Sequence, residues 1–492
     1  MFGLFNKYRK KSETTVGLII VSYRSHDTLT QFVTNCCKAS LSVPMYLGDV
    51  ENNRLTLYGE SNFCEPTEKF VLITDDLSDP FELKWMLETL QNGQSDVILT
   101  QGKIRLDPFL SVSPLPLWDR LINEFSDRPE LGSASLANLP IALPFSEWSA
   151  HNGLQILRNP IQSHLILTKS QWRIGVNERL SSPLSSLEQH GVKTSFAIKE
   201  RLEAYLSLLP PPRGGWNDGA RRRDMVEKLN QGSLLLPPPC PGTDFSFKGS
   251  TDDAKSLSVI IPAQNEEATI GQVILEAQML GPKEIIVVIN GSSDQTEMIA
   301  RAHGAVTLSF QESLGTDVGR AIGAYAAQSE ILLFLDGDFI IPWQDLSPFV
   351  DAAATCCDLA VNQLNQHLGM RMPPGTVTAL KYALNVALGR EDLENASLVN
   401  VPFAMNRRAL EVMHWTNLQC PPKAYALGLL GGLHSLPVHH VEVDRLNRYR
   451  HGKHDLAGER YSQAAIQIIG DHIEAMHTIL DRKGGMDHHD EA

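Results

Sequence analysis

The chain has 492 residues, of which 42% are hydrophobic, and its formal net charge at pH 7 is −14. This length exceeds one ordinary domain and the hydrophobic content suffices for packed cores, so we expect two domains. The negative charge argues against nucleic-acid binding and against broad adhesion to anionic lipid, because both partners are themselves anionic. No apolar run approaches the length that spans a bilayer, and no segment resembles the hydrophobic region of a signal peptide.

Seven cysteines are spread through the chain, and none shows the spacing of a metal site. An odd number with two adjacent pairs is typical of buried thiols in a reducing compartment, so we expect a cytoplasmic protein. Residues 1–15 carry aromatic and basic side chains, which fit either a disordered N-terminus or a peripheral contact with a membrane. Disorder is the commoner behaviour of a chain end.

Residues 16–208 alternate apolar strands with helices, as is typical of an α/β domain. Strands are predicted at 16–23, 70–77 and 96–99, with helices after the first two. Asp75 and Asp76 are neighbours near the end of the second strand. Side chains of adjacent strand residues point to opposite faces, so these two carboxylates form a poor metal pair.

Residues 209–255 are predicted to form a linker. Proline runs at 210–212 and 237–239 cannot lie inside a sheet and favour an extended, stiff chain. One short helix is expected between them. A run of three arginines at 221–223 fits either a clamp for an anionic group or, as is commoner, the solvent-exposed face of this helix.

Residues 256–345 alternate strands and helices in the order of a doubly wound sheet. The strands are predicted at 257–262, 284–289, 305–308 and 331–335, and the helices at about 268–280, 293–302 and 315–327. The last of these strands is a continuous apolar run. Such a run is typical of a parallel strand that is buried on both faces.

Asp336 and Asp338 follow this apolar strand at spacing i, i+2, so both carboxylates leave the same face and can converge on one cation. Oxygen ligands of this kind suit Mg²⁺ or Mn²⁺, usually with substrate phosphates completing the shell. The carboxyl ends of parallel strands are also where open α/β sheets bind ligands. The alternative is a solvent-exposed turn, since Asp-Gly is a common turn dipeptide.

Three motifs in this half resemble the nucleotide-sugar half of family 2 glycosyltransferases of the GT-A fold. They are IIPAQNEEATI, VVINGSSDQT and GRAIGAYAAQSEILLFLDGD, in the family's order and spacing, and the resemblance extends over about 256–450. It implies a metal-dependent enzyme that moves a sugar from a nucleoside-diphosphate sugar to an acceptor that the sequence does not identify. The alternative is a non-catalytic protein of the same fold that binds a nucleotide sugar or serves as a scaffold.

The resemblance also assigns roles to individual side chains. The residues expected to bind the nucleotide sugar are Pro262, Asn265, Glu266, Glu267, Asn290, Asp294, Arg320 and Asp336. Asp336 and Asp338 would hold the Mg²⁺ or Mn²⁺ ion, and Asp338 and Arg320 would take part in catalysis. The family usually has an acidic residue just before its Gly-Ser pair, where this chain has Asn290; an amide can still hydrogen-bond a nucleobase.

We expect two GT-A-like, Rossmann-like α/β domains in tandem, at 16–208 and 256–457, with the first degenerate. The expectation rests on internal similarity. The matching segments are 16–30 with 257–270, 70–77 with 331–338, and 163–172 with 401–410. The first domain has no counterpart of the NGSSD turn, which favours a catalytically silent unit.

The acceptor side departs from many inverting members of the family, in which a Glu-Asp pair supplies the base for the acceptor hydroxyl. The matching region at 419–426 contains no carboxylate. Either the base lies elsewhere, for example at Glu391, Asp392 or Glu394, or the enzyme retains configuration and needs none.

A basic segment at 444–456 follows the last predicted strand, at 437–443. It is similar to retaining glucosyl-3-phosphoglycerate synthases, in which a histidine completes the metal site and arginines receive a phosphorylated acceptor. The similarity makes His451 a metal ligand, with His454 as the alternative. A loop of exposed imidazoles and charges is the other interpretation.

Residues 458–492 are predicted to hold a final helix and a charged tail. Apolar and small side chains recur at helical spacing over 461–480. This face fits either packing within the chain or a homodimer.

Overall fold

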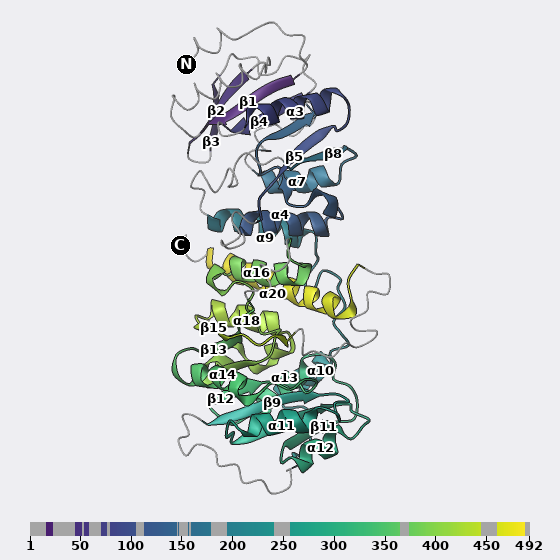
Figure 1. Cartoon of the computed structure of the whole chain (residues 1–492), viewed down its shortest axis with the longest axis vertical. Coiled ribbons are helices and arrows are strands. Elements are labelled where there is room, and N and C mark those ends of the chain that lie inside the picture. The colour runs from purple at the N-terminus through teal and green to yellow at the C-terminus, as the bar shows by residue number, and fades with distance from the viewer. Residues whose placement is uncertain are drawn as a thin grey trace. The chain divides into compact units, whose positions relative to one another are not determined.

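The computed structural model forms two compact units, Met1–Leu208 and Leu209–Ala492 (Figure 1). The structure describes residues 16–22, 45–51, 54–58, 70–75, 79–104, 113–144, 146, 156, 159–178, 194–240, 256–364, 373–443 and 460–487. Residues 1–15, the helix expected after the first strand, and the basic segment with His451 and His454 lie outside this part. Both units are mixed α/β with parallel strands, which confirms the α/β part of the expected fold class.

The second unit is built on a seven-stranded mixed sheet with the strand order β11-β10-β9-β12-β14-β13-β15. Its strands are β9 (Leu257–Ala263), β10 (Glu284–Asn290), β11 (Val306–Phe310), β12 (Ile331–Phe334), β13 (Leu359–Asn362), β14 (Phe403–Asn406) and β15 (Ser435–His439). Strand β14 is antiparallel to both of its neighbours, and the other neighbours are parallel. The carboxyl ends of β9, β10 and β12 therefore meet at one edge.

Helices connect and cover these strands. They are α10 (Arg223–Asn230), α11 (Ile270–Gln278), α12 (Thr296–Ala302), α13 (Val318–Ala326), α14 (Trp343–Thr355), α16 (Thr376–Ala387), α17 (Arg407–Met413), α18 (Pro421–Leu430) and α20 (Gln463–Asp487). Helix α13 packs closely on β9 through its glycines Gly319 and Gly323. A Cβ atom at Gly319 would lie 3.0 Å from the Cβ atom of Pro262, at the limit of ordinary contact.

The first unit contains an eight-stranded sheet with the order β3-β2-β1-β4-β7-β5-β6 and with β8 beside β5. Its strands are β1 (Val16–Ser22), β2 (Met45–Glu51), β3 (Arg54–Tyr58), β4 (Phe70–Asp75), β5 (Val97–Gln101), β6 (Ala134–Ser135), β7 (Ile141–Pro144) and β8 (Ile174–Asn177). Its helices include α3 (Pro80–Gln91), α4 (Pro114–Phe125), α7 (Pro160–Thr168) and α9 (Thr194–Ser207).

The two sheets share strand order and direction over most of their width. The run β2-β1-β4-β7-β5-β8 matches β10-β9-β12-β14-β13-β15, with parallel and antiparallel pairs in the same places. The outer strands differ, since β3 is antiparallel to β2 whereas β11 is parallel to β10.

A buried asparagine holds the same turn in both units. The side-chain amide of Asn123 donates to two backbone carbonyls at 2.9 and 2.8 Å, and that of Asn385 donates to two carbonyls at 2.8 and 3.0 Å. The turns themselves are similar in sequence, RPELGSASLANLP at 128–140 and REDLENASLVNVP at 390–402. The correspondence between the two units therefore includes these turns, which were not matched with each other from the sequence.

The expected match between 163–172 and 401–410 is wrong. Residues 160–168 form helix α7, whereas residues 403–413 form β14 and then α17. The strand that corresponds to β14 is β7. Helix α7 begins with Pro160 at its first position, where the fixed φ and missing N–H of proline are favourable.

The structure bears on two further features for which the sequence left alternatives. The arginine run at 221–223 is not uniformly solvated, because the Arg221 side chain is 0% exposed, whereas those of Arg222 and Arg223 are 37% and 33% exposed. The apolar face of α20 is used within the chain: Ile469, Ile473 and Ile479 are buried, and α20 lies against α16 and α18 (Figure 1). Within the described ranges, no helix is both long and apolar enough to cross a membrane.

Replacing either turn asparagine with alanine would leave two backbone carbonyls without their donor. We expect Asn123→Ala and Asn385→Ala each to lower the free energy of unfolding by about 2–3 kcal/mol. Urea denaturation measures the loss, and hydrogen exchange shows that each substitution weakens its own unit. Asn230→Ala, at an exposed helix end, is the control. Losses equal to that of the control would contradict the shared role.

Candidate functional site

The acidic turn Asp336-Gly337-Asp338 lies directly after the buried strand β12. Strand β12 pairs with β9 on one side and β14 on the other, so the sheet fixes where the turn begins. The hydroxyl of Thr269 donates to the carbonyl of Gly337 at 2.7 Å and ties the turn to the start of α11. The Asp336 side chain is 35% exposed, and Asp338 is partly exposed with its Oδ1 atom buried.

Arg320 on α13 anchors the first carboxylate of this turn. Its Nη2 lies 3.0 Å from Oδ1 of Asp336, and its Nη1 lies 3.2 Å from Oδ1 of Asp317. The guanidinium also donates to the carbonyl of Leu398 at 3.3 Å and lies over the ring of Phe403. Burial alone would lower the pKa of Arg320, but the carboxylates of Asp336 and Asp317 outweigh it and raise that pKa. The acidic turn therefore faces a fixed positive charge.

The loops that follow β9 and β10 are joined by reciprocal hydrogen bonds. Oδ1 of Asn265 accepts from the backbone N–H of Ser293 at 2.8 Å. The N–H of Glu267 donates to Asp294 at 3.1 Å, and the carboxylate of Glu267 accepts from the N–H of Gln295 at 3.1 Å. Asn265 has a φ of 58°, a left-handed conformation that asparagine adopts more readily than most residues. The two loops thus form one rigid rim.

Asn290 engages the loop that leads to α13. Its Oδ1 accepts from the backbone N–H of Leu314, and its Nδ2 donates to the carbonyl of Gly315 at 3.1 Å. Both ends of the amide therefore contact protein backbone. This contact was not expected from the sequence, and it ties the end of β10 to the segment that presents Arg320.

The structure gathers the candidate residues at one edge of the sheet, because β10, β9 and β12 are adjacent parallel strands. These residues are Pro262, Asn265, Glu266, Glu267, Asn290, Asp294, Arg320, Asp336 and Asp338. His451, the third expected metal ligand, lies outside the described residues. Within the described ranges, no group of three or more His, Cys, Asp or Glu side chains has the geometry to hold a metal ion.

The chemistry of the acidic turn fits a hard divalent cation. Mg²⁺ is commonly held by one or two carboxylates together with water and substrate phosphates, so a protein site of two carboxylates is sufficient. Asp336 and Asp338 supply such oxygen donors at this edge of the sheet. Mn²⁺ suits the same donor set.

Asp392, one of the alternative base candidates, lies at the opposite edge. Arg390 pairs with it at 2.7 Å and also donates to the carbonyl of Ser435 at 3.4 Å. Ser435 begins β15, which runs in the same direction as β12. The start of β15 and the end of β12 therefore lie at opposite edges of the sheet, so Asp392 is remote from the acidic turn.

Comparison with known proteins identifies the segment that carries this site. Residues 258–411 match the family described as glycosyl transferase family 2. The second unit therefore contains a domain of this family, which confirms the resemblance seen in the sequence.

Curated relatives match a smaller share of the chain. Glucosyl-3-phosphoglycerate synthase from Mycobacterium tuberculosis is 33% identical over 114 residues, which are 21% of this chain and 35% of that protein. The 4,4'-diaponeurosporenoate glycosyltransferase from Staphylococcus aureus is 35% identical over 92 residues, 17% of this chain and 24% of that protein. The chain thus spans about a third or less of the length of these relatives.

Solved structures also show similarity. Glucosyl-3-phosphoglycerate synthase from Mycobacterium tuberculosis, in complex with Mn²⁺, uridine diphosphate and glucosyl-3-phosphoglycerate, is 22% identical with a TM-score of 0.33. The match covers 50% of this chain and 88% of that one. A complex of the same enzyme with uridine diphosphate is 23% identical with a TM-score of 0.35, covering 51% and 88%.

The hydrogen bonds between the loops after β9 and β10 predict that stability depends on pH. Burial would raise the pKa of Asp294, but hydrogen bonds from Thr296 and Glu267 outweigh it and lower that pKa from its usual 3.8. A depressed carboxylate pKa stabilises the folded state above the unfolded-state pKa, and this stability is lost as pH falls through the folded-state pKa. We expect Asp294→Asn to lower the free energy of unfolding by about 1–2 kcal/mol at neutral pH and by less in acid.

Urea denaturation at pH 7 and in acid measures this difference. Asp351→Asn, on the exposed side of α14, is the matched control. A loss of the same size at both pH values would show that the charge of Asp294 is not responsible.

Proposed function

We propose that this chain is a metal-dependent glycosyltransferase that moves a sugar from a nucleoside-diphosphate sugar to an acceptor that remains to be identified. The observation that carries the proposal is the acidic turn Asp336-Gly337-Asp338 beside a buried arginine. This turn lies at the edge of the sheet where the adjacent parallel strands β9, β10 and β12 end, the place where open α/β sheets bind ligands. It also falls inside the segment that matches glycosyl transferase family 2.

The two curated relatives support a site for a sugar donor and do not identify the acceptor. Their names specify different acceptors, a phosphoglycerate and a diaponeurosporenoate. One is a glycosyltransferase by name and the other is named for a glucosylated product, so the chemistry that they share is transfer of a sugar. Transfer of a sugar is therefore the part of the activity that the similarity supports best.

The side chains of the site have separable roles in this proposal. Asp336 and Asp338 would hold the Mg²⁺ or Mn²⁺ ion, which when bound stabilises negative charge on a departing diphosphate. Arg320 orients Asp336 through their 3.0 Å contact and adds a positive charge that does not depend on the metal. The rim formed by Asn265, Glu267 and Asp294 would contact the nucleoside.

The competing proposal is a protein of the same fold that binds a nucleotide sugar without transferring it. The position of Asp392 favours it, because this candidate base lies at the far edge of the sheet. A retaining enzyme, however, needs no such base. Hydrolysis of a sugar donor, with and without Mn²⁺, distinguishes the two proposals.

We also propose that the first unit is a degenerate GT-A-like domain. The shared strand order supports this, and so does the register of the two central strands. Ile73 pairs with Ile141 as Phe334 pairs with Phe403. Counting onward along the sequence, Asp75 takes the place of Asp336, and the position of Asp338 holds a leucine.

Three expectations stay predictions. They are the role of His451 or His454 as a metal ligand, a cytoplasmic location, and contact of the N-terminal segment with a membrane.

The central test of the proposal is Asp338→Asn, which removes one charged ligand and keeps the shape of the side chain. We expect the Mn²⁺-dependent binding of UDP or GDP, measured by calorimetry, to weaken by more than about 100-fold. Asp392→Asn, at the opposite edge, serves as the control. Unchanged affinity in the Asp338 variant would exclude this turn as the metal site.

The degenerate first unit leads to a second test. We expect the double variant Asp75→Ala, Asp76→Ala to hydrolyse a sugar donor at a rate within about twofold of the unmodified protein, because one of two converging carboxylates is missing there. A loss as large as that of Asp338→Asn would mean that the first unit also carries an active site.

A further inference from the structure

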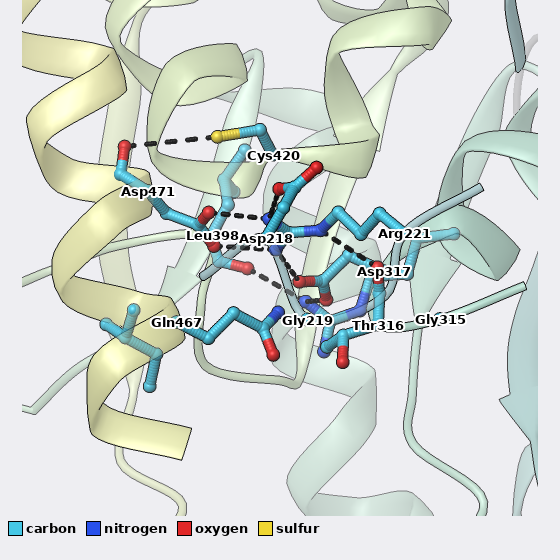
Figure 2. A network of polar contacts seen from close by, with 12 residues as sticks. Asp218, Gly219, Arg221, Gly315, Thr316, Asp317, Leu398, Cys420, Gln467 and Asp471 are labelled. Carbon is cyan, nitrogen blue, oxygen red and sulfur yellow. Dashed lines mark hydrogen bonds and ion pairs between the residues drawn. The ribbon is translucent and has the colours of Figure 1, made fainter. Parts of the chain in front are cut away.

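An ion-pair network connects the segment before α10, the C-terminal helix α20 and the loop before α13 in the second unit (Figure 2). Its basic members are Arg213, Arg221, Arg223 and Lys423, and its acidic members are Asp218, Asp317, Asp471 and Glu474. The two signs of charge balance. Each arginine lies against a carboxylate of the protein, so the network is not a clamp for an anionic ligand.

Arg221 is the centre of this network. Its guanidinium donates to both carboxylate oxygens of Asp471, at 2.6 and 2.7 Å. It also donates to Oδ2 of Asp317 at 3.0 Å and to the carbonyl of Thr316 at 3.0 Å (Figure 2). Burial alone would lower the pKa of Arg221, but Asp471 and Asp317 outweigh it and raise that pKa. The arginine is thus a permanent cation with a fixed set of acceptors.

The backbone around Arg221 is held as closely as its side chain. The N–H of Arg222 donates to the carbonyl of Leu314 at 2.8 Å. A Cβ atom at Gly315 would lie 2.7 Å from Cα of Arg221, and one at Gly219 would lie 2.5 Å from Oε1 of Gln467. Both glycines also have a positive φ. Only glycine fits at these two points, where the segment passes between the loop before α13 and α20.

The network continues to the acidic turn through Asp317. This residue adopts a left-handed conformation with a φ of 62°, directly before α13. One carboxylate oxygen contacts Arg221 at 3.0 Å and the other contacts Arg320 at 3.2 Å. Arg320 in turn contacts Asp336 at 3.0 Å. An unbroken series of alternating charges therefore runs from Asp471 to Asp336.

We propose that Arg221 and Asp471 are positioning residues of the active site. They hold Asp317, which sets the orientation of Arg320 and, through it, of the metal-binding carboxylate Asp336. The inference rests on the proposed function and deepens it. It makes the segment before α10 and the helix α20 parts of the nucleotide and metal site, although both lie outside the residues 258–411 that match the family.

The energetics favour positioning over simple stabilisation. A buried ion pair gains little over well-packed apolar side chains, because removing both charges from water offsets most of their attraction. The paired charges instead fix the orientation of the side chains. The two-oxygen contact of Arg221 with Asp471 fixes the plane of the guanidinium, and this plane determines where Asp317 lies.

Two substitutions interrupt the series and leave the residues of the acidic turn unchanged. Asp317→Asn keeps the size of the side chain and removes the charge between the two arginines. Arg221→Lys keeps the charge and removes the planar fork. We expect each to weaken Mn²⁺-dependent UDP binding by the full-length chain by about 10-fold or more, as is usual for groups that orient metal ligands. Arg222→Gln is the control, since its side chain pairs with exposed Asp224 and Glu312.

Calorimetry is carried out at a temperature at which circular dichroism shows every variant folded. Because the two residues act in series, the Arg221→Lys, Asp317→Asn double variant should bind no more weakly than the weaker single variant. A purely structural role would instead lower the melting temperature and leave the affinity for Mn²⁺ and UDP unchanged. If Arg221→Lys fails to fold, Asp317→Asn alone decides.

The Asp338→Asn variant separates failure of this inference from failure of the proposed function. Unchanged binding in Asp338→Asn means that the turn is not the metal site, and both proposals fall. Lost binding in Asp338→Asn, with Asp317→Asn and Arg221→Lys as tight as Arg222→Gln, overturns the positioning role alone.

Discussion

The buried guanidinium of Arg320 is the constraint on which the rest of the site depends. A charge removed from water is stable only with partners in fixed places. Arg320 takes them from three parts of the chain: Asp336 after β12, Asp317 before α13, and the carbonyl of Leu398 ahead of β14. A shift in any of these segments would leave a buried charge incompletely paired. The edge of the sheet is therefore held in one arrangement before any ligand arrives.

Local patterns predicted the half of the second unit that forms this edge. Buried parallel strands appear as unbroken apolar runs, so β9, β10 and β12 were all expected close to their observed positions. The i, i+2 spacing of Asp336 and Asp338 was visible for the same reason. The contact of Arg221 with Asp471 was not, because its partners are 250 residues apart and each resembles an ordinary surface charge. Only tertiary packing converts such a run of arginines into a buried network.

The correspondence between the units shows which sequence signals are reliable. An apolar run does not distinguish a strand from a buried helix, and this ambiguity produced the wrong match at 163–172. Turn residues are more specific, because each serves a particular backbone geometry. The repeated Arg, Ala-Ser-Leu, Asn and Pro of 128–140 and 390–402 were available in the sequence and would have aligned β7 with β14.

The buried charges differ between the two units. This difference argues that the units share the arrangement of their strands and the asparagine turn, which together form a common frame, and not a functional site. In the first unit Asp119 on α4 pairs with Arg201 on α9 at 2.7 Å, with both side chains 0% exposed. At the matching place on α16 the second unit has Lys381, which donates to Asn400. The sign of the charge is reversed while the strand order and the asparagine turn persist. A fold accepts any buried pair whose partners are satisfied, whereas a metal site needs particular carboxylates. A domain that lost its metal site but preserved its fold would therefore keep this frame and lack the second carboxylate, as the sequence of the first unit does.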